Sequence, residues 1–134
     1  MKNGKIIWEK MMDFALENGF DFFRLIYFDK KELDKTLWKF KEEEKKSNWK
    51  WFLGGKDGFW YIEGKLTEES EKALKEMKWN GFGFVRIYVF DKQKTKHIRL
   101  NADNYIFFKT PNKKEQSLLN EILKPLGSSK QLSF

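Results

Sequence analysis

The 134-residue sequence predicts a single α+β domain. Segments rich in aromatic and β-branched residues alternate with segments whose apolar residues recur at helical spacing. Hydrophobic residues make up 40% of the chain and charged residues 35%, which is the balance of a globular protein rather than a disordered one. We expect residues 1–127 to form the domain and residues 128–134 to form a flexible tail.

Aromatic and β-branched runs bounded by turn-forming residues predict six strands. They cover residues 20–28, 49–53, 57–66, 82–90, 95–100 and 105–109. Apolar residues at helical spacing predict four helices. These helices begin at Asn3 or Gly4, at Asp29, at Thr67 and at Thr110, and the second one is expected to end in the charged run 39–46.

Start and stop signals support each helix. Asn18-Gly19 ends the first helix, because both residues tolerate the left-handed conformation. Asp29 and Glu32 have the spacing of a capping box for the second. Thr67 caps the third, whose first turn is acidic as the helix dipole prefers. Thr110-Pro111 supplies a cap and a proline at the first helical position of the last.

Between residues 20 and 90 the predicted order is strand-helix-strand-strand-helix-strand. This is the split βαβ, or ferredoxin-like (βαββαβ), arrangement, in which two helices cover one face of an antiparallel sheet. An N-terminal helix and a C-terminal β-hairpin plus helix extend it. The second face of the sheet stays open unless these additions cover it.

Two of the predicted strands carry aromatic and basic side chains on the face that is not apolar. Large aromatic rings are normally buried, and a common reason for exposing them on a sheet is to stack nucleic-acid bases. We therefore expect an aromatic and basic platform. It consists of Phe59, Tyr61, Lys65, Phe82, Phe84, Arg86 and Tyr88.

The net charge of +7 is concentrated in the C-terminal third of the chain. Between Lys92 and Lys114, seven basic side chains face one carboxylate, which gives this segment a net charge of +6. A basic patch attracts polyanions, of which nucleic acid is the commonest, although a Lys-rich solvated surface is the alternative explanation. We expect four side chains of this segment to hold a phosphate backbone in a salt-dependent way, namely Lys92, Lys94, Lys96 and Arg99.

The element order and the run Gly58-Phe59-Trp60-Tyr61-Ile62 resemble the RNA-recognition-motif family. Gly58, Phe59, Tyr61 and Ile62 match the family's third-strand pattern, whereas Trp60 departs from it and Asp57 stands where the family has a base. Ile26-Tyr27-Phe28 is similar to the first-strand motif, and the resemblance implies that Tyr27 lies beside the platform. The mixture of aromatics and lysines is also similar to the ThermoDBP-like single-stranded DNA-binding proteins of thermophiles.

The expected function is non-catalytic, largely sequence-independent binding of single-stranded DNA or RNA in the cytoplasm, without a cofactor. In the alternative structural interpretation, the aromatics form a second small core beneath the added helices. Two alternative functions stay open. One is a protein-interaction module or inhibitor of the viral or mobile-element type, and the other is a small ferredoxin-like ribonuclease with His97 as proton carrier. With no cysteine and a single histidine, the chain offers little for a metal cluster.

The end of the chain suggests a protein partner. Gln131-Leu132-Ser133-Phe134 resembles a shortened sliding-clamp-binding peptide, so Gln131, Leu132 and Phe134 are expected to contact such a clamp unless the terminus is simply frayed. No apolar run approaches the ~18 residues of a membrane span. The high Lys and Glu content is compatible with a thermophilic origin or with a biased genome composition.

Overall fold

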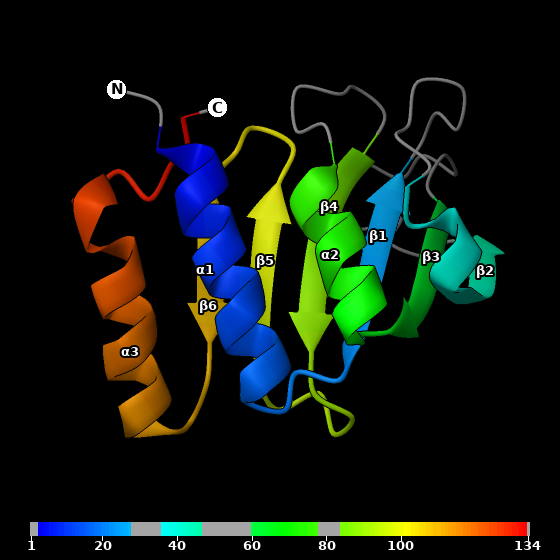
Figure 1. Ribbon diagram of the computed structural model, residues 1–134, viewed down its shortest axis with the longest axis horizontal. Helices are drawn as coiled ribbons and strands as arrows, with labels where there is room; N and C mark the ends of the chain where they lie inside the picture. The colour runs from blue at the N-terminus through cyan, green and yellow to red at the C-terminus, as the bar shows by residue number, and fades with distance from the viewer. Residues whose placement is uncertain (1–2, 28–35, 47–59, 78–83, 134) are drawn as a thin grey trace.

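The computed structural model describes residues 3–27, 36–46, 60–77 and 84–133. Within these residues the protein is α+β, with a six-stranded antiparallel sheet and three α-helices (Figure 1). The strands are β1 (Phe22–Tyr27), β2 (Lys41–Lys46), β3 (Trp60–Lys65), β4 (Phe84–Phe90), β5 (His97–Asn101) and β6 (Ile106–Lys109). The helices are α1 (Gly4–Glu17), α2 (Glu68–Glu76) and α3 (Lys113–Leu123), with short 3₁₀ helices η1 (Trp38–Phe40) and η2 (Lys124–Leu126).

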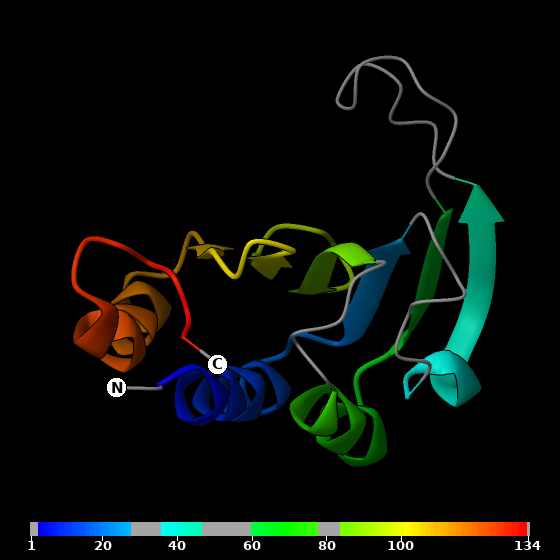
Figure 2. The ribbon, with the colours of Figure 1, turned by 90° about the horizontal axis from the view of Figure 1, so that it is seen from above.

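The strands lie side by side in the order β2-β3-β1-β4-β5-β6, and every neighbouring pair is antiparallel. Helices α1, α2 and α3 all lie on one face of this sheet, as the view in Figure 2 makes plain. No helix lies against the opposite face in the part of the chain that the structure describes. The protein therefore has two layers there, one of helices and one of strands.

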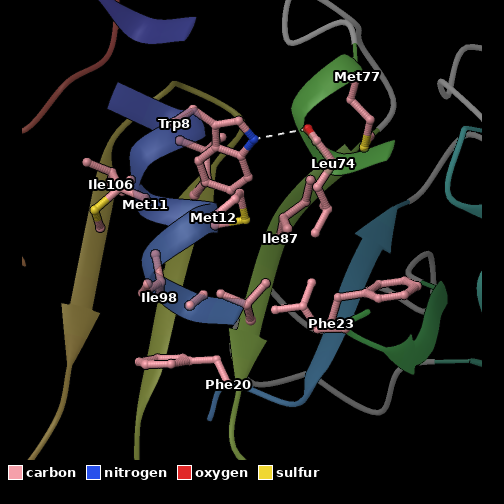
Figure 3. Packing of buried hydrophobic residues seen from close by; sticks show 14 of the residues in the cluster. Trp8, Met11, Met12, Phe20, Phe23, Leu74, Met77, Ile87, Ile98 and Ile106 are labelled. Atoms are coloured by element: carbon pink, nitrogen blue, oxygen red, sulfur yellow. Dashed lines mark hydrogen bonds between the residues drawn. The ribbon is translucent and has the colours of Figure 1, made fainter. Parts of the chain in front are cut away.

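The core fills the space between the two layers (Figure 3). Alternate strand residues, such as Phe23, Ile87 and Ile98, point toward the helices and are buried. They meet the apolar side of α1, where the indole Nε1 of Trp8 also donates a hydrogen bond of 3.0 Å to the carbonyl of Leu74 in α2. This bond gives the buried indole N–H its partner and joins the two helices.

The first turn of α2 confirms the sequence-based prediction for its cap. The Thr67 Oγ1 accepts from the Ser70 N–H at 3.2 Å, and the Ser70 Oγ accepts from the Thr67 N–H at 2.8 Å. The prediction for α3 was wrong by a few residues, because Asn112 rather than Thr110 is its cap. The Asn112 Oδ1 accepts from the Glu115 N–H at 3.0 Å, whereas the Thr110 hydroxyl donates to the Glu115 carboxylate at 2.7 Å.

The charged run 39–46 was predicted to be the end of a helix, and this prediction was wrong. Residues 41–46 form the edge strand β2, which pairs with β3. Its carboxylates accept from tyrosine hydroxyls of other strands: Glu44 from Tyr27 at 2.5 Å and Glu43 from Tyr61 at 3.2 Å. These long-range contacts and the ladder to β3 outweigh the local helical preference of Lys and Glu. Residues 29–35 of that predicted helix lie outside the described residues, as does the predicted strand 49–53, and Trp38–Phe40 form the 3₁₀ helix η1.

The last residues lie along the domain. Gln131 forms an antiparallel bridge with Tyr105, and the Gly4 N–H donates to the Ser133 carbonyl at 2.7 Å. Leu132 is 3% exposed and belongs to the hydrophobic core. Residues 128–133 thus connect the N-terminal end of α1 to the edge of the sheet beside β6. Among the described residues, no helix is long and apolar enough to cross a membrane.

Candidate nucleic-acid interface

The face of the sheet opposite the helices is the candidate site, and we call it the open face. Its side chains come from the strand positions that alternate with the buried core residues. Ile26 and Phe90 share this parity but are buried, at 1% and 7% exposed. The described open-face side chains are Phe22, Arg24, Glu43, Lys45, Tyr61, Glu63, Lys65, Arg86, Tyr88, Phe90, His97, Arg99, Asn101, Phe107 and Lys109.

The register places one row of alternating arginines and aromatics across four strands. Arg24, Tyr88, Arg99 and Phe107 are direct neighbours in β1, β4, β5 and β6. The Arg99 guanidinium lies 4.4 Å from the centroid of the Phe107 ring, which is 39% exposed. The Arg24 guanidinium lies 4.5 Å from the Tyr61 ring and pairs with Glu63 at 3.2 Å. Guanidinium groups held over rings present flat cationic surfaces to the solvent side of the sheet.

A second row carries aromatic rings and a histidine. Phe22 and Phe90 stack with their centroids 5.8 Å apart, and the His97 ring meets Tyr88 edge to face at 5.6 Å. Burial lowers the pKa of His97, and the charges of Arg99 and Lys109 lower it further. The imidazole is therefore neutral at neutral pH and acts as one more flat ring on the face.

Charge divides the open face into two halves. The sequences of β1, β4, β5 and β6 contain no Asp or Glu, whereas β2 and β3 carry four glutamates, of which Glu43 and Glu63 face each other on the open face. On the cationic half, the Nε atoms of Arg24 and Arg99 are buried and have no hydrogen-bond partner among the described residues. The half formed by β1, β4, β5 and β6 is therefore suited to an anionic, ring-bearing ligand.

Several predicted site residues meet on this face. Tyr61, Lys65, Arg86, Tyr88 and Arg99 all lie on it. Since α1, α2 and α3 cover the opposite face, the described aromatics of the open face do not form a second core beneath those helices. Phe59 and Phe82 lie outside the described residues, as does the side chain of Phe84, whose backbone belongs to β4.

Other predicted site residues lie elsewhere. Tyr27 is 2% exposed and belongs to the core, so the prediction that it lies beside the platform was wrong. The physical reason is parity, because Tyr27 alternates with Ile26 and shares the face of Leu25. Lys92 and Lys94 are exposed in the turn between β4 and β5.

Lys96 is directed largely toward the helices. Its Nζ lies 3.0 Å from a carboxylate oxygen of Glu115 in α3 and donates to the Asn18 carbonyl at 2.5 Å. The same ammonium group lies 4.7 Å from the centroid of the Phe20 ring. Lys96 therefore contributes little unpaired charge to the open face.

Four residues of the open face were not predicted from the sequence to belong to the interface, namely Arg24, His97, Phe107 and Lys109. A usable signal was present, because aromatic or basic residues alternate with aliphatic ones in β1 and β5. What the sequence alone lacked was the pairing that brings β5 and β6 beside β4.

Among the described residues, no group of three or more His, Cys, Asp or Glu side chains is placed to hold a metal ion. Comparison of the chain with protein-family models, with curated proteins and with solved structures gives no significant match.

Proposed function

We propose that the protein binds single-stranded DNA or RNA through the open face, with little sequence preference and without catalysis. One observation carries the proposal: four adjacent strands present aromatic rings and cationic groups on one face and contain no carboxylate. Rings suit unstacked bases of any sequence, and the cations suit the phosphates between them.

In this mechanism, bases separate from one another and stack on Phe107, Tyr88 and the neighbouring rings. Each such contact is worth about 1–3 kcal/mol in proteins of this kind. Arg86, Arg99 and Lys109 contact phosphates and release counterions, so affinity falls as salt rises. A duplex keeps its bases stacked inside and offers the rings nothing, so it should bind less tightly than a single strand.

The finer fold assignment is part of the proposal. A ferredoxin-like unit over residues 22–90 is supported by the strand order β4-β1-β3-β2, in which each crossover skips one strand, and by α2 between β3 and β4. The helix that this arrangement requires between β1 and β2 would fall within residues 28–35, outside the described part of the chain. The proposal keeps the resemblance to RNA-recognition motifs and to ThermoDBP-like proteins, together with a cytoplasmic location.

Contact with a sliding clamp through the end of the chain is a separate proposal. It relies on Gln131, Leu132 and Phe134, and it requires Leu132 to leave its buried position. Pull-down of a clamp by the full chain and its loss in Leu132→Ala, with an unchanged far-ultraviolet spectrum, would test it.

The main experiment measures fluorescence anisotropy of labelled oligo-dT and oligo-U across salt concentrations, with unlabelled duplex as competitor. We expect Phe107→Ala to weaken binding roughly 5- to 150-fold, the equivalent of one lost stacking contact. Arg99→Ala should weaken binding and also reduce the salt slope by about 0.7, the value for one phosphate contact on a single strand. Leu118→Ala is the matched control, because Leu118 is 45% exposed on α3 in the helix layer.

Each outcome has a distinct reading. Equal binding by all variants and the wild type would move any nucleic-acid contact off the open face. No binding at low salt would refute the function and favour the protein-interaction module. Cleavage of the RNA strand by purified protein that disappears in His97→Ala would favour the ribonuclease alternative instead.

A further inference from the structure

A hollow of about 250 Å³ lies at one end of the open face, beside the turn that joins β4 to β5. Its lining residues are Arg24, Tyr88, Phe90, Lys94, Lys96 and His97. None of them is acidic. Small-molecule sites in proteins typically measure about 300–1,000 Å³, so this hollow is smaller than a typical site and suits a single small unit rather than several.

Aromatic rings form one part of the lining. Tyr88 and Phe90 come from β4, and His97 lies opposite Phe90 on β5. The edge-to-face contact of Tyr88 with His97 and the stack of Phe22 on Phe90 fix the positions of these rings. A rigid group of rings loses little side-chain entropy when a base is placed against it.

The turn beside the hollow is held by Asp91. The Asp91 carboxylate accepts hydrogen bonds from the Thr95 N–H at 2.7 Å, from the Thr95 hydroxyl and from the Lys96 N–H at 3.0 Å. The Lys94 N–H donates to the Asp91 carbonyl at 3.0 Å, and Lys94 has a φ of 59° in the left-handed region. The one carboxylate of the turn is thus occupied by the turn itself, while Lys94 lines the hollow.

The three lining cations differ in how far their charge is already paired. Arg24 pairs with Glu63 at 3.2 Å, and Lys96 pairs with Glu115 at 3.0 Å. Lys94 has no ion pair within the described parts of the chain and is exposed. Lys94 is therefore the cation whose charge is available to a ligand in the hollow.

We propose that this hollow is a subsite for a single nucleotide, with the base against the rings of Tyr88 and His97 and a phosphate on the Lys94 ammonium. Where the nucleotide is part of a bound single strand, the subsite rests on the proposed function and adds a specific contact to it. A free nucleoside monophosphate would make the same contacts. The experiment below distinguishes a free nucleotide from one that belongs to a strand.

The test compares two variants of one turn. Lys94→Gly removes the side chain that lines the hollow and suits the left-handed backbone. Lys92→Gly removes the same charge from an exposed neighbour that does not line it. Lys94→Asn is the second variant at the site, because Asn also tolerates this conformation. Thermal unfolding of each variant establishes that it is folded before binding is measured.

Binding of labelled oligo-dT and oligo-U is measured by anisotropy, and binding of dTMP and UMP by calorimetry. We expect Lys94→Gly and Lys94→Asn to weaken oligonucleotide binding about tenfold, the scale of a lost charge-assisted contact. Lys92→Gly should change it less than about threefold, because its charge acts only through screened solvent.

Equal effects of the Lys94 and Lys92 variants would overturn the subsite. The proposed function would survive that result if Phe107→Ala still weakened binding of the strand. Binding of dTMP or UMP that is lost in Lys94→Gly, with no binding of strands by the wild type, would support the subsite and refute the proposed function. The experiment can therefore refute the nucleotide subsite without refuting strand binding by the open face, and the reverse.

Discussion

Substitution of Gly64 by alanine tests the packing that separates the two faces of β3. Gly64 lies on the buried face of the strand, between the carbonyl of Phe40 in η1 and the ring of Phe23 in β1. A Cβ atom at this position would lie 2.2 Å from the Phe40 carbonyl oxygen and 2.9 Å from the Phe23 Cε1 and Cζ. The nearer contact is with backbone, so no side-chain rotation relieves it.

The expected change in the free energy of unfolding is opposite to the usual effect of replacing glycine by alanine in a strand. Replacing glycine by alanine within a strand ordinarily stabilises a protein by about 0.5–1 kcal/mol, because the unfolded chain loses freedom. Overpacking costs about 1–3 kcal/mol, and more where backbone has to move. We expect Gly64→Ala to lower the free energy of unfolding by about 3 kcal/mol, a large part of the roughly 5–15 kcal/mol of an ordinary domain. The melting temperature should fall by about 10 °C.

Urea unfolding followed by tryptophan fluorescence and by far-ultraviolet circular dichroism measures this change. Lys65→Ala is the control on the same strand, where an exposed side chain should alter stability by less than about 0.5 kcal/mol. A Gly64→Ala protein as stable as the wild type, or more stable, would refute the close approach of η1 to β3.

Three further predictions concern stability and pH. Trp8→Phe should lower the free energy of unfolding by about 1–3 kcal/mol in urea titration, because the Leu74 carbonyl loses its buried donor; an unchanged midpoint would contradict the bond. Burial alone would raise the pKa of Asp91, but hydrogen bonds from Thr95 and from backbone N–H groups outweigh it and lower that pKa. Asp91 therefore stabilises the fold above its ordinary pKa of 3.8, and Asp91→Asn should be less stable than wild type at pH 7, with a difference that shrinks as the pH falls below 3.8. The His97 ring should titrate by NMR with a midpoint below 6.5, and a midpoint at or above 6.5 would contradict its burial beside cations.

Local signals predicted much of the fold. Apolar spacing in residues 4–17 and the cap at Thr67 gave helices that the structure contains, since both depend on near neighbours in the chain. The run 41–46 was predicted incorrectly, because its strand conformation comes from pairing with β3. The start of α3 was displaced because Thr110 and Asn112 are both competent caps, and side-chain geometry selects Asn112.

The residues of the candidate site were likewise predictable only in part. Alternation along a single strand was enough to group Tyr61 with Lys65, and Arg86 with Tyr88. The prediction for Tyr27 was wrong, because alternation along a strand shows which residues share a face but not which of the two faces is buried. Arg99 was selected for its charge, whereas its place over the Phe107 ring depends on the register of β5 with β6.

The sequence by itself determined the α+β class, the basic character of the C-terminal third and the alternation of rings with aliphatic residues, because composition and periodicity are local properties of a chain. Only the tertiary structure decided that α1, α2 and α3 lie together on one face of the sheet. The pairing of strands far apart in the sequence then placed Arg24, Tyr88, Arg99 and Phe107 in one row. Such pairings form because all the strands bury one face against the helices together, and the sequence of a single segment does not specify this.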